Sequence, residues 1–497
     1  GPVNEPVRVQ SFGEYERAFG GLWNDSTMSF AVQQYFNNGG SDAIIVRAYL
    51  TNSHDYASIV LTTINPAGPG VAGTLTLTAA SKGAWGNNLE VVVDRSAYSD
   101  DYSFDLTIQE NVGGTIVARE VYYGLTVDAT ATKYVGRVLD NQSALMKVLD
   151  GGLTPSDTGA PASTVLATVV NPHKADDGLA LTEAAVKGLA TNKSGMYALE
   201  TADIFNILCF PPLKPLDEAV PGDYSDPDHI HYNDDYSPAL WGEAIAYVKK
   251  RRAVVIVNPL IAWNTVSEVT DADHGFDTLT KDENAVFYFP NVKAPNPLRE
   301  FQLETYSPCG IAAGIMARTD STRGIWKAPA GLDANIRGVQ ALDVRMTDGE
   351  NGQLNPLGVN CLRTLPAAGH VIWGARTMKG NDRLASEWKY LPVRRLALYL
   401  EESLYRGIQW AVFEPNDEPL WAQLRLNVGA FMHQLFRQGA FQGSSPKDAY
   451  FVKCDKETTT QNDINQGIVN VVVGFAPLKP AEFVVLKIQQ IAGQIES

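Results

Sequence analysis

The last stretch of the chain, residues 467–490, constrains the fold most because it places two strand patterns where the sequence is about to end. Residues 468–473 are β-branched almost throughout, which is typical of a buried strand. Residues 483–490 alternate between apolar and polar side chains. One face of this second pattern carries Val484, Leu486 and Ile488, and the other carries Lys487 and Gln489. A terminal strand of this kind needs a sheet to join.

The segment between the two strand patterns contains Pro477 and Pro480. Proline removes a backbone donor and keeps the preceding residue extended, so this junction suits an arm that leaves a domain better than a tight hairpin. Two interpretations remain open on this pattern. The final strand either completes its own domain, as chain termini commonly do, or adds a strand to the sheet of a neighbouring subunit.

Size and composition indicate a folded protein of about three domains, since the chain has 497 residues, 45% of them hydrophobic and 19% charged. The net charge of −16 opposes non-specific binding to nucleic acid or to anionic membranes, and it favours solubility at high concentration. No window approaches twenty uninterrupted apolar residues, so we expect no direct membrane insertion. Ordinary secretion signals are also absent from the sequence as given.

Cysteines and the N-terminus add two further expectations. Four cysteines lie far apart without a C-x-x-C pair, which predicts neither a metal knuckle nor a small disulfide framework. A reducing cytoplasm is the simplest setting for them. The sequence starts at Gly1-Pro2 without a methionine, so we expect that residues upstream were cleaved or removed.

Along the chain, the first 55 residues read as strand, helix, helix, strand, with Gly39-Gly40 placed as a helix C-cap before an apolar run. From about residue 61 to 168 the composition changes to Thr, Val and Gly with short alternating runs, which predicts an inserted β-rich domain. The α/β pattern then returns. It is expected as a strand over 204–210, a helix over 238–250 with Ser237 as its N-cap, and a strand over 253–257.

The final third is more helical. Apolar residues recur every three or four positions from Leu396 to Ile408 and again from Leu420 to Leu435, which predicts two amphipathic helices. The loop 414–418 separates them. Both stripes are interpreted as core packing.

Catalytic motifs are missing. The sequence has no G-x-S-x-G and no G-T-S-x-A, and His274-Gly275 is followed by Phe276, where a subtilase would carry a small hydroxyl residue. A literal G-x-G-x-x-G at 68–73 is interrupted by Pro69 and precedes a strand, so no helix N-terminus would face a phosphate. We therefore expect no enzyme activity and no cofactor.

The best candidate for chemistry is the loop 217–235, which is rich in carboxylates and contains no lysine or arginine. Clustered oxygens suit hard cations, and the two histidines could serve a transition metal. The spacing fits no metal cage, and an exposed acidic loop is the interpretation preferred here, so no metal is expected. Its ionisable residues are Asp217, Glu218, Asp223, Asp226, Asp228, His229, His231, Asp234 and Asp235.

Several phrases spread over nearly the whole chain occur together in one protein family. The opening seven residues, the helix and Gly-Gly phrase that follow, and a Trp-Gly-Asn phrase in the β-rich region belong to this set. The phrase with the greatest weight is Trp326-Lys327-Ala328-Pro329-Ala330-Gly331. It is followed by Leu354-Asn355-Pro356, Gly358-Val359-Asn360, Trp373-Gly374-Ala375-Arg376-Thr377, Gln409-Trp410 and Phe413-Glu414-Pro415-Asn416. In this order and spacing the chain resembles the contractile tail sheath family of phage tails, R-type bacteriocins and related injection systems.

The resemblance implies an α/β and α+β multidomain fold. A subtilisin-like α/β core without a catalytic triad would comprise residues 1–55 and 196–365. An inserted β-rich outer domain would comprise 56–195, and a C-terminal sheath domain 366–497 would end in a strand-exchanging arm from about 476. By the same resemblance, we expect the family's N-terminal arm to be absent from the sequence as given.

The resemblance also implies a function. The chain would be a structural subunit that polymerises as stacked hexameric rings around an inner tube and contracts to drive the tube through a target envelope. Its expected partners are further copies of itself, the inner tube protein, and baseplate and terminator or cap proteins, with no nucleic acid. Assembly would take place in the cytoplasm, and the product would be a virion tail or a released or cytoplasmic contractile particle.

Three groups of site residues follow from this interpretation. The inter-subunit strand is expected at Phe483, Val484, Val485, Leu486, Lys487 and Ile488. The arm hinge is expected at Pro477, Lys479 and Pro480. Residues expected near the tube are Glu414, Asn416, Asp417, Glu418 and Gln423.

Two other functions compete with the sheath interpretation. A divergent subtilisin-like hydrolase would require a serine, a histidine and an aspartate that meet in one pocket. A monomeric surface-binding protein would use the β-rich domain and would stay a single subunit at every concentration. Neither alternative accounts for the terminal arm.

Overall fold

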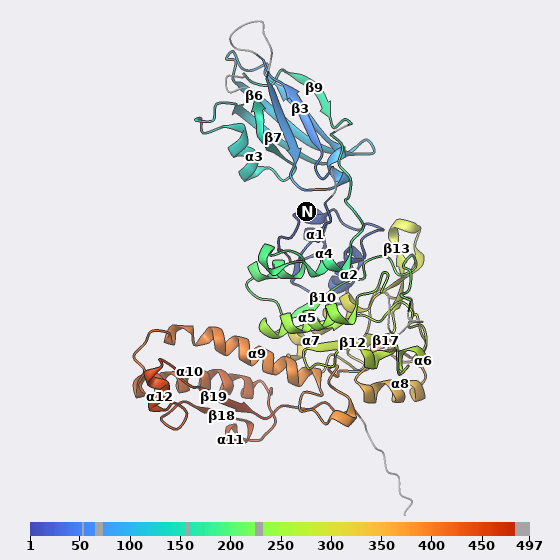
Figure 1. The fold of residues 1–497 in the computed structure, drawn as a ribbon, viewed down its shortest axis with the longest axis vertical. Coiled ribbons are helices and arrows are strands. Elements are labelled where there is room, and N and C mark those ends of the chain that lie inside the picture. Colours follow the sequence, from blue (N-terminus) through green and yellow to red (C-terminus); the bar gives the residue numbers. More distant parts are fainter. Residues whose placement is uncertain (52–53, 65–72, 155–158, 172, 224–231, 483–497) are drawn as a thin grey trace, which may run out of the picture. The chain divides into compact units, whose positions relative to one another are not determined.

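The computed structural model describes residues 1–51, 54–64, 73–154, 159–171, 173–223 and 232–482. The chain forms two compact units (Figure 1). Unit 1 comprises residues 1–8, 17–20 and 44–202, and unit 2 comprises 9–16, 21–43 and 203 onward. The expected mixture of α/β and β-rich parts is confirmed by several separate sheets, whereas the four domain boundaries stay predictions.

Unit 1 contains the β-rich part expected from the sequence. One sheet has the strand order β3-β4-β8 and the other β7-β6-β5-β9, with antiparallel neighbours throughout. Their bounds are β3 Ser58–Thr62, β4 Thr74–Ala79, β5 Leu89–Asp94, β6 Ser103–Val112, β7 Thr115–Thr126, β8 Met146–Thr154 and β9 Thr164–Thr168. The unit also holds two short helices, α3 Val135–Gln142 and α4 Glu183–Lys187.

Alternation along these strands explains their pairing. In β4 and β5 every second side chain is buried, so each strand turns one face to a shared interior. This interior is a core of its own, formed by buried side chains between Ala57 and Ala175. The longest hairpin joins β6 to β7 through Gly113-Gly114, which both adopt positive φ, as a tight hairpin turn requires.

Unit 2 is built around a five-stranded sheet with the order β10-β11-β12-β16-β17. The first four strands are parallel neighbours, and β17 closes the sheet in the antiparallel direction. The bounds are β10 Ile207–Cys209, β11 Val254–Val257, β12 Ala285–Phe289, β16 Asn360–Leu365 and β17 Gly369–Ile372. Both β11 and β12 are buried at every position, as expected for a parallel sheet covered on both faces. The strand expected over 204–210 is shorter than predicted.

Two helices around this sheet show how local sequence sets their form. The helix α5 (Pro238–Lys250) has the predicted bounds, and the Ser237 side chain accepts a hydrogen bond from the Leu240 N–H. The helix α7 (Cys309–Arg323) packs closely on α2 (Thr27–Asn37). This contact depends on Gly310 and Gly314, since a Cβ at either position would lie 2.2 Å from the Ala31 carbonyl oxygen or 2.5 Å from that of Tyr35.

The C-terminal region of unit 2, residues 391–477, consists of two long helices and a small sheet (Figure 1). The helices α9 (Leu391–Gly407) and α10 (Glu418–Arg437) contain the two predicted apolar stripes. They pack with β18 (Tyr450–Lys453) and β19 (Val472–Phe475) around a shared core that includes Leu400, Val428 and Met432.

The structure corrects the first terminal strand. We expected a strand over 468–473, but β19 begins at Val472 and pairs antiparallel with β18. Before β19, the Ile468 carbonyl accepts a hydrogen bond from the Asn416 side chain, and the Asn470 N–H donates one to the Thr459 side chain. The second strand pattern, 483–490, lies outside the described residues, as does most of the glycine motif at 68–73.

The remaining elements are short or connect those above. The three-stranded sheet β14-β13-β15 is antiparallel, and β1 pairs with β2. Their bounds are β1 Val7–Val9, α1 Phe12–Phe19, β2 Ala43–Ile45, α6 Val266–Val269, β13 Val292–Asn296, β14 Gln302–Tyr306, β15 Ala341–Leu342, α8 Asp348–Leu354, α11 Pro446–Ala449 and α12 Gln461–Asn465.

Candidate functional site

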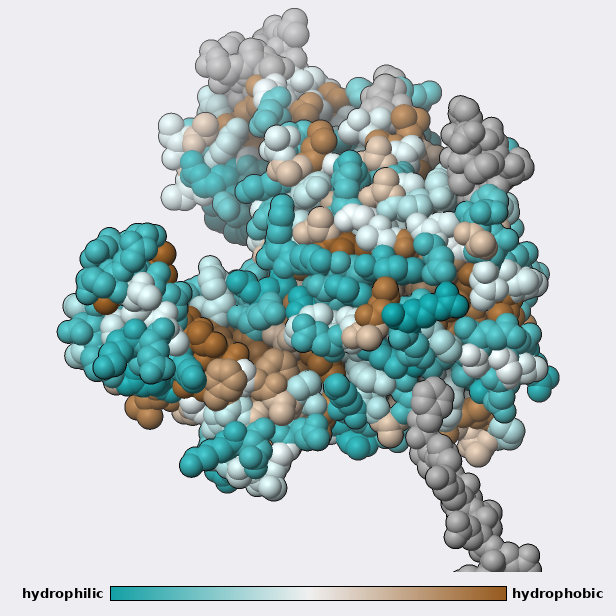
Figure 2. All heavy atoms as spheres, turned by 60° about the horizontal axis from the view of Figure 1, so that its bottom comes forward, coloured by the Kyte–Doolittle hydropathy of each residue, from teal (hydrophilic) through white to brown (hydrophobic). Residues whose placement is uncertain are grey.

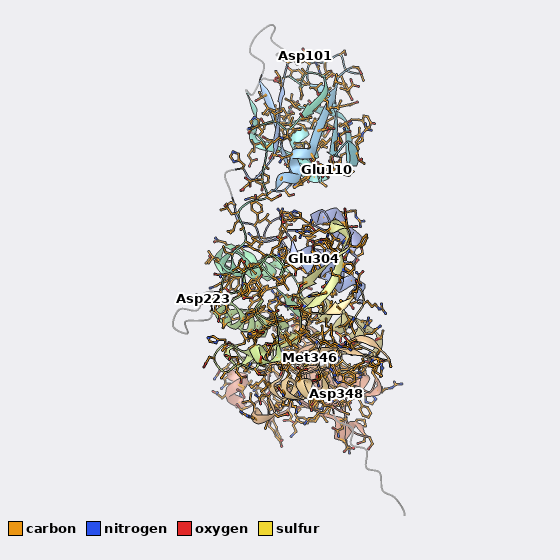
Figure 3. The ribbon with its side chains drawn as sticks, turned by 90° about the vertical axis from the view of Figure 1, so that its right-hand side faces the viewer. Asp101, Glu110, Asp223, Glu304, Met346 and Asp348 are labelled. Carbon is orange, nitrogen blue, oxygen red and sulfur yellow. The ribbon has the colours of Figure 1, made fainter. Side chains whose placement is uncertain are left out.

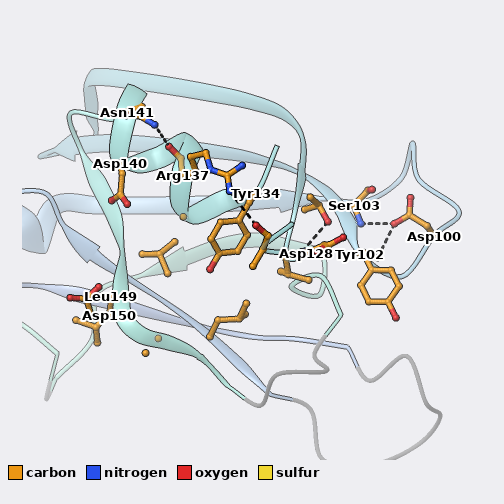
Figure 4. Close-up of a pocket in the computed structure, with 18 residues that line it drawn as sticks. Asp100, Tyr102, Ser103, Asp128, Tyr134, Arg137, Asp140, Asn141, Leu149 and Asp150 are labelled. Carbon is orange, nitrogen blue, oxygen red and sulfur yellow. Dashed lines mark hydrogen bonds between the residues drawn. The ribbon is translucent and has the colours of Figure 1, made fainter. Parts of the chain in front are cut away.

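A large cleft lies in unit 1 between α3, β8 and the ends of β6 and β7 (Figure 4). It has a volume of about 1500 Å³ and is lined by four aspartates, Asp100, Asp128, Asp140 and Asp150. The Asp100 carboxylate accepts hydrogen bonds from the N–H groups of Tyr102 and Ser103, and the bond from Tyr102 contributes most to lowering its pKa. Arg137 in the lining donates to the carbonyls of Ala129 and Ala131. The cleft therefore has an acidic lining, in which Asp100 and Arg137 hold neighbouring loops by hydrogen bonds to their backbone.

The acidic loop 217–235 is tied to its surroundings by its described carboxylates. Asp217 accepts from the Thr305 N–H at 2.8 Å, and Glu218 pairs with Arg299 at 2.6 Å. Asp234 pairs with Lys214 at 2.9 Å, and Asp235 accepts from the Ile261 N–H at 2.9 Å. Described chain stops at Asp223 (Figure 3) and resumes at residue 232, so His229 and His231 lie outside it.

Figure 3 also shows Glu304 on β14, a carboxylate close to this loop. Its Oε2 accepts from Asn296 at 2.7 Å and from the Tyr306 hydroxyl at 3.2 Å, and Arg299 lies 3.3 Å from its Oε1. Within the part of the chain that the structure describes, no group of three or more His, Cys, Asp or Glu side chains could hold a metal ion.

The beginning of the predicted arm is held by main-chain hydrogen bonds. The Ala476 N–H donates to the Ala449 carbonyl at 2.8 Å, and the Ala476 carbonyl accepts from the Gln442 N–H at 2.9 Å. Pro477 forms an antiparallel bridge with Phe441. The predicted hinge residues Pro477, Lys479 and Pro480 therefore follow directly on a fixed point, and their role as a hinge stays a prediction. The predicted strand residues Phe483 to Ile488 lie outside the described residues.

Five residues further on, the chain is held again, at Glu482. Arg376, which has no exposed side-chain surface, donates from Nε and Nη2 to the two Glu482 carboxylate oxygens at 2.8 and 2.6 Å. Its Nη1 donates to Asp382 at 3.0 Å and to the Gly380 carbonyl at 3.1 Å. Burial works against the charge of Arg376, but the Glu482 and Asp382 carboxylates outweigh it and raise the pKa of the guanidinium.

The backbone of Arg376 is fixed as firmly as its side chain. Asn360, fully buried at the start of β16, accepts from the Arg376 N–H at 2.7 Å and donates to the Arg376 carbonyl at 2.8 Å. Gly374 makes room for this contact, because a Cβ there would lie 2.9 Å from the Asn360 side-chain oxygen. Two of the phrases on which the resemblance was based, 358–360 and 373–377, thus meet in one structural site.

The residues predicted to face the tube lie at the start of α10 and in the loop before it. Asp417 is the N-cap and accepts from the Glu418 N–H, while Glu418 pairs with Arg425 at 2.5 Å. Asn416 is half-buried and accepts from the Trp421 indole at 2.9 Å. Glu414, Asp417, Glu418 and Gln423 are exposed. Their exposure leaves them accessible, and the tube contact itself stays a prediction.

Sequence reasoning assigned no role to Phe413 or Arg376, each of which it quoted only within a family phrase. Phe413 is fully exposed, at 102% of its reference area, and has φ +70°, a conformation that costs a bulky side chain free energy. Arg376 was noticed only as part of a phrase. Its partner Glu482 is 106 positions away, so no local pattern could have paired them.

The small sheet of β18 and β19 has unpaired strand edges among the described residues, since its order contains only these two strands. One face packs on the core shared with α9 and α10, and the other exposes Phe451 and Val472 at 50% and 45%. Figure 2 shows hydrophobic surface gathered on the C-terminal region in this view. An unpaired edge next to exposed apolar side chains is a place where another strand can add.

Taken together, these features define a multi-sheet α/β protein whose described part has a two-stranded sheet with unpaired edges and an anchored terminal segment. Two family models match the chain, the phage tail sheath protein central domain over residues 233–378 and the phage tail sheath C-terminal domain over 385–491. The chain belongs to the phage tail sheath family.

One curated relative supports this assignment. The tail sheath protein of Salmonella phage ViI is 23% identical over 229 residues, which are 45% of this chain and 35% of the relative. The chain therefore aligns with only about a third of that protein's length.

Among the described residues, no helix is both long and apolar enough to cross a bilayer.

Solved structures show the same fold. A sheath tail protein from Listeria innocua matches with a TM-score of 0.61 and 13% identity, over 96% of this chain and 92% of that one. A contracted sheath complex of the extracellular injection system PVC matches with a TM-score of 0.55 and 20% identity, over 99% and 88%. A chain from the six-fold symmetrised anti-feeding prophage baseplate is 28% identical, with a TM-score of 0.50, over 64% and 76%.

Proposed function

We propose that the chain is a structural subunit of a contractile tail sheath, which polymerises as stacked hexameric rings around an inner tube and contracts to drive the tube through a target envelope. The observation that carries this proposal is the match of both sheath family models to the part of unit 2 that contains the strand edge and the anchored arm. A protein of this kind works by repacking subunit contacts. It is not an enzyme and needs no cofactor.

The sheet of β18 and β19 is the proposed acceptor of a strand from a neighbouring subunit. The outer edge of β19 is the proposed site, because β18 pairs along its other edge. The Phe441–Gln442 segment bonds to Ala476 and Pro477, which follow β19. A strand added at the outer edge of β19 would continue the apolar face that covers Val428 and Met432. The donor would be Phe483 to Ile488, whose alternating pattern offers one apolar face to this core.

Further partners follow from the same proposal. The exposed group Glu414, Asp417, Glu418 and Gln423 would face the inner tube, and the exposed Phe413 precedes it in the same loop. Baseplate and terminator or cap proteins would meet the two ends of the assembly. We place assembly in the cytoplasm and the finished sheath in a virion tail or a released or cytoplasmic contractile particle.

The finer domain plan is also part of the proposal. The parallel strands β10, β11, β12 and β16 would form the centre of a subtilisin-like core, and unit 1 would supply the outer β-rich domain. Energy for contraction would come from the larger contact area of the contracted lattice, with backbone hydrogen bonds in shared sheets keeping subunits connected.

Negative-stain electron microscopy of the purified chain tests the proposal directly. We expect striated hollow tubes or stacked rings. A variant truncated after Glu482 should remain folded and should not polymerise, because only the donated strand is lost. A variant truncated after Pro480 should in addition unfold at lower temperature, since Arg376 then keeps only the Asp382 carboxylate.

Two results would overturn the sheath function. Dispersed single particles at high concentration, with the native upstream residues present, would favour the monomeric surface-binding protein. Labelling by a serine-reactive probe would favour the hydrolase. Unfolding of the variant truncated after Glu482 would show that the last strand belongs to its own subunit.

A further inference from the structure

We propose that Arg376 is the positioning residue that sets where the exchanged arm begins, by holding Glu482 in every state of the sheath. This inference rests on the proposed function. The last fixed residue before the arm is then Glu482, which follows both prolines. Residues 478–481 connect two fixed residues, Pro477 and Glu482, and are not the hinge about which the arm turns.

The first support is the number of bonds that converge on the pair. Two hydrogen bonds from the planar guanidinium of Arg376 reach both oxygens of Glu482, which fixes distance and orientation together. The Tyr390 hydroxyl donates to the same carboxylate at 3.3 Å, and the Lys389 ammonium lies 3.8 Å from it. Glu482 is therefore held by three side chains of the residue 376–390 segment.

The second support is the burial of the charge. Arg376 has no exposed surface and the Glu482 side chain is 15% exposed. Pulling Glu482 away would leave the buried guanidinium with a single carboxylate, which would destabilise the folded subunit. Because the cost of breaking such a pair is large, the pair persists while weaker surface contacts exchange.

The third support is the rigidity of the base to which Glu482 is held. The Arg376 backbone is bonded on both sides by Asn360, inside the five-stranded sheet of unit 2. Tyr390 is the N-cap of α9, the helix that carries the C-terminal core. The arm thus starts from a point fixed to both the sheet and the helix of its own subunit.

A fixed origin has a measurable consequence for assembly. Strand exchange depends on how often the tethered strand meets its acceptor, which falls as the flexible tether lengthens. With the latch of Arg376 and Glu482 closed, the fixed point lies directly before the donor strand, which is expected to begin at Phe483. Opening the latch frees residues 478–482 as a flexible tether, which can also point the strand away from the acceptor.

Nitroxide mobility at position 481 provides the test. Ala481 is exposed, so Ala481→Cys accepts a spin label, and the parent protein without this cysteine controls for labelling of the four native thiols. We expect an immobilised label in the unassembled subunit, a mobile label in the Glu482→Gln background, and intermediate mobility in the Arg376→Lys background. Glu283→Gln is the matched control, because its carboxylate pairs with Lys379 and is 17% exposed but does not touch Arg376. That control should leave the label immobile.

Assembly gives the second readout. Glu482→Gln should raise the critical concentration for polymerisation by about tenfold, and Glu283→Gln should not. A label that is equally mobile with and without Glu482 would overturn the latch and return the pivot to Pro477, Lys479 and Pro480. If the unaltered chain forms no tubes while the label responds as expected, the latch stands and the sheath function fails. If tubes form normally in every variant, the latch does not position the arm.

Discussion

The guanidinium of Arg395 on α9 donates two hydrogen bonds to the carboxylate of Asp320 on α7, at 2.8 and 2.5 Å, and so ties the C-terminal region to the central sheet. Arg395 is 4% exposed and Asp320 28%. Both helices also pack against the core of the central sheet, α7 through Met316 and α9 through Leu398.

Asp320→Ala should lower the free energy of unfolding of unit 2 by about 3 kcal/mol, because it leaves the charge of Arg395 buried and unpaired. Urea denaturation followed by tryptophan fluorescence measures the change. Arg323→Ala is the control, since the pair of Arg323 and Asp333 is largely exposed and should contribute less than about 1 kcal/mol. Equal losses in the two variants would contradict the prediction.

Close packing of α2 on α7 predicts that Gly314→Ala is poorly tolerated. The added methyl group would meet the Tyr35 carbonyl oxygen at 2.5 Å, so the helices must separate, at a cost of about 1–3 kcal/mol. Gly429→Ala in α10 is the matched helical control. No atom lies within 4 Å of the position of its added methyl group, and we expect a gain of about 0.4–1 kcal/mol. Thermal unfolding of both variants decides the matter.

Lys281 predicts a pH dependence of stability. Its ammonium lies 3.0 Å from the centroid of the Phe276 ring and donates to the Phe276 carbonyl, and burial lowers its pKa from 10.5 to about 7. Between these two values the unfolded chain binds a proton that the folded chain does not, so stability rises with pH, by at most about 1.4 kcal/mol per pH unit.

The comparison with Lys281→Met isolates this effect from other titrating groups. The variant should be more stable than the parent at pH 7, and the difference in melting temperature should shrink towards pH 10. A difference that stays constant over this range would show that Lys281 is charged in the folded protein at neutral pH and above.

Phe413 predicts a gain in stability on substitution. The side chain is fully exposed, so its removal loses no packing, and asparagine adopts the left-handed backbone conformation more readily than phenylalanine. Phe413→Asn should therefore raise the free energy of unfolding of the subunit by about 1 kcal/mol. Phe413→Ala keeps most of the backbone cost and should change little. A loss of stability in Phe413→Asn would show that the ring has a partner in the isolated subunit.

Local signals predicted those elements whose ends are set by neighbouring residues. The helix α5 begins where expected because the Ser237 cap and Pro238 set its first turn. The strand expected over 468–473 begins later because the Ile468 carbonyl and the Asn470 N–H are bonded to the side chains of Asn416 and Thr459. Pairing with β18 starts only at Val472.

The arm anchor shows the limit of sequence reasoning. The prolines at 477 and 480 predict an extended junction, which stays a prediction, and nothing near Glu482 indicates a buried arginine as its partner. The resemblance included the phrases 358–360 and 373–377 but did not explain why these residues occur there. The structure supplies the reason, because Asn360, Gly374 and Arg376 form one tightly fitted site.

The separate interior of unit 1 has a practical consequence. Both sheath family models match within 233–491, and the core of unit 1 is closed by residues between 57 and 175, so changes in one set need not disturb the other. At the tip of the β6–β7 hairpin, Gly113 and Gly114 have open space around them. A peptide tag inserted between these two glycines would be displayed by the folded subunit, and a repeating polymer of such subunits would present it at regular spacing.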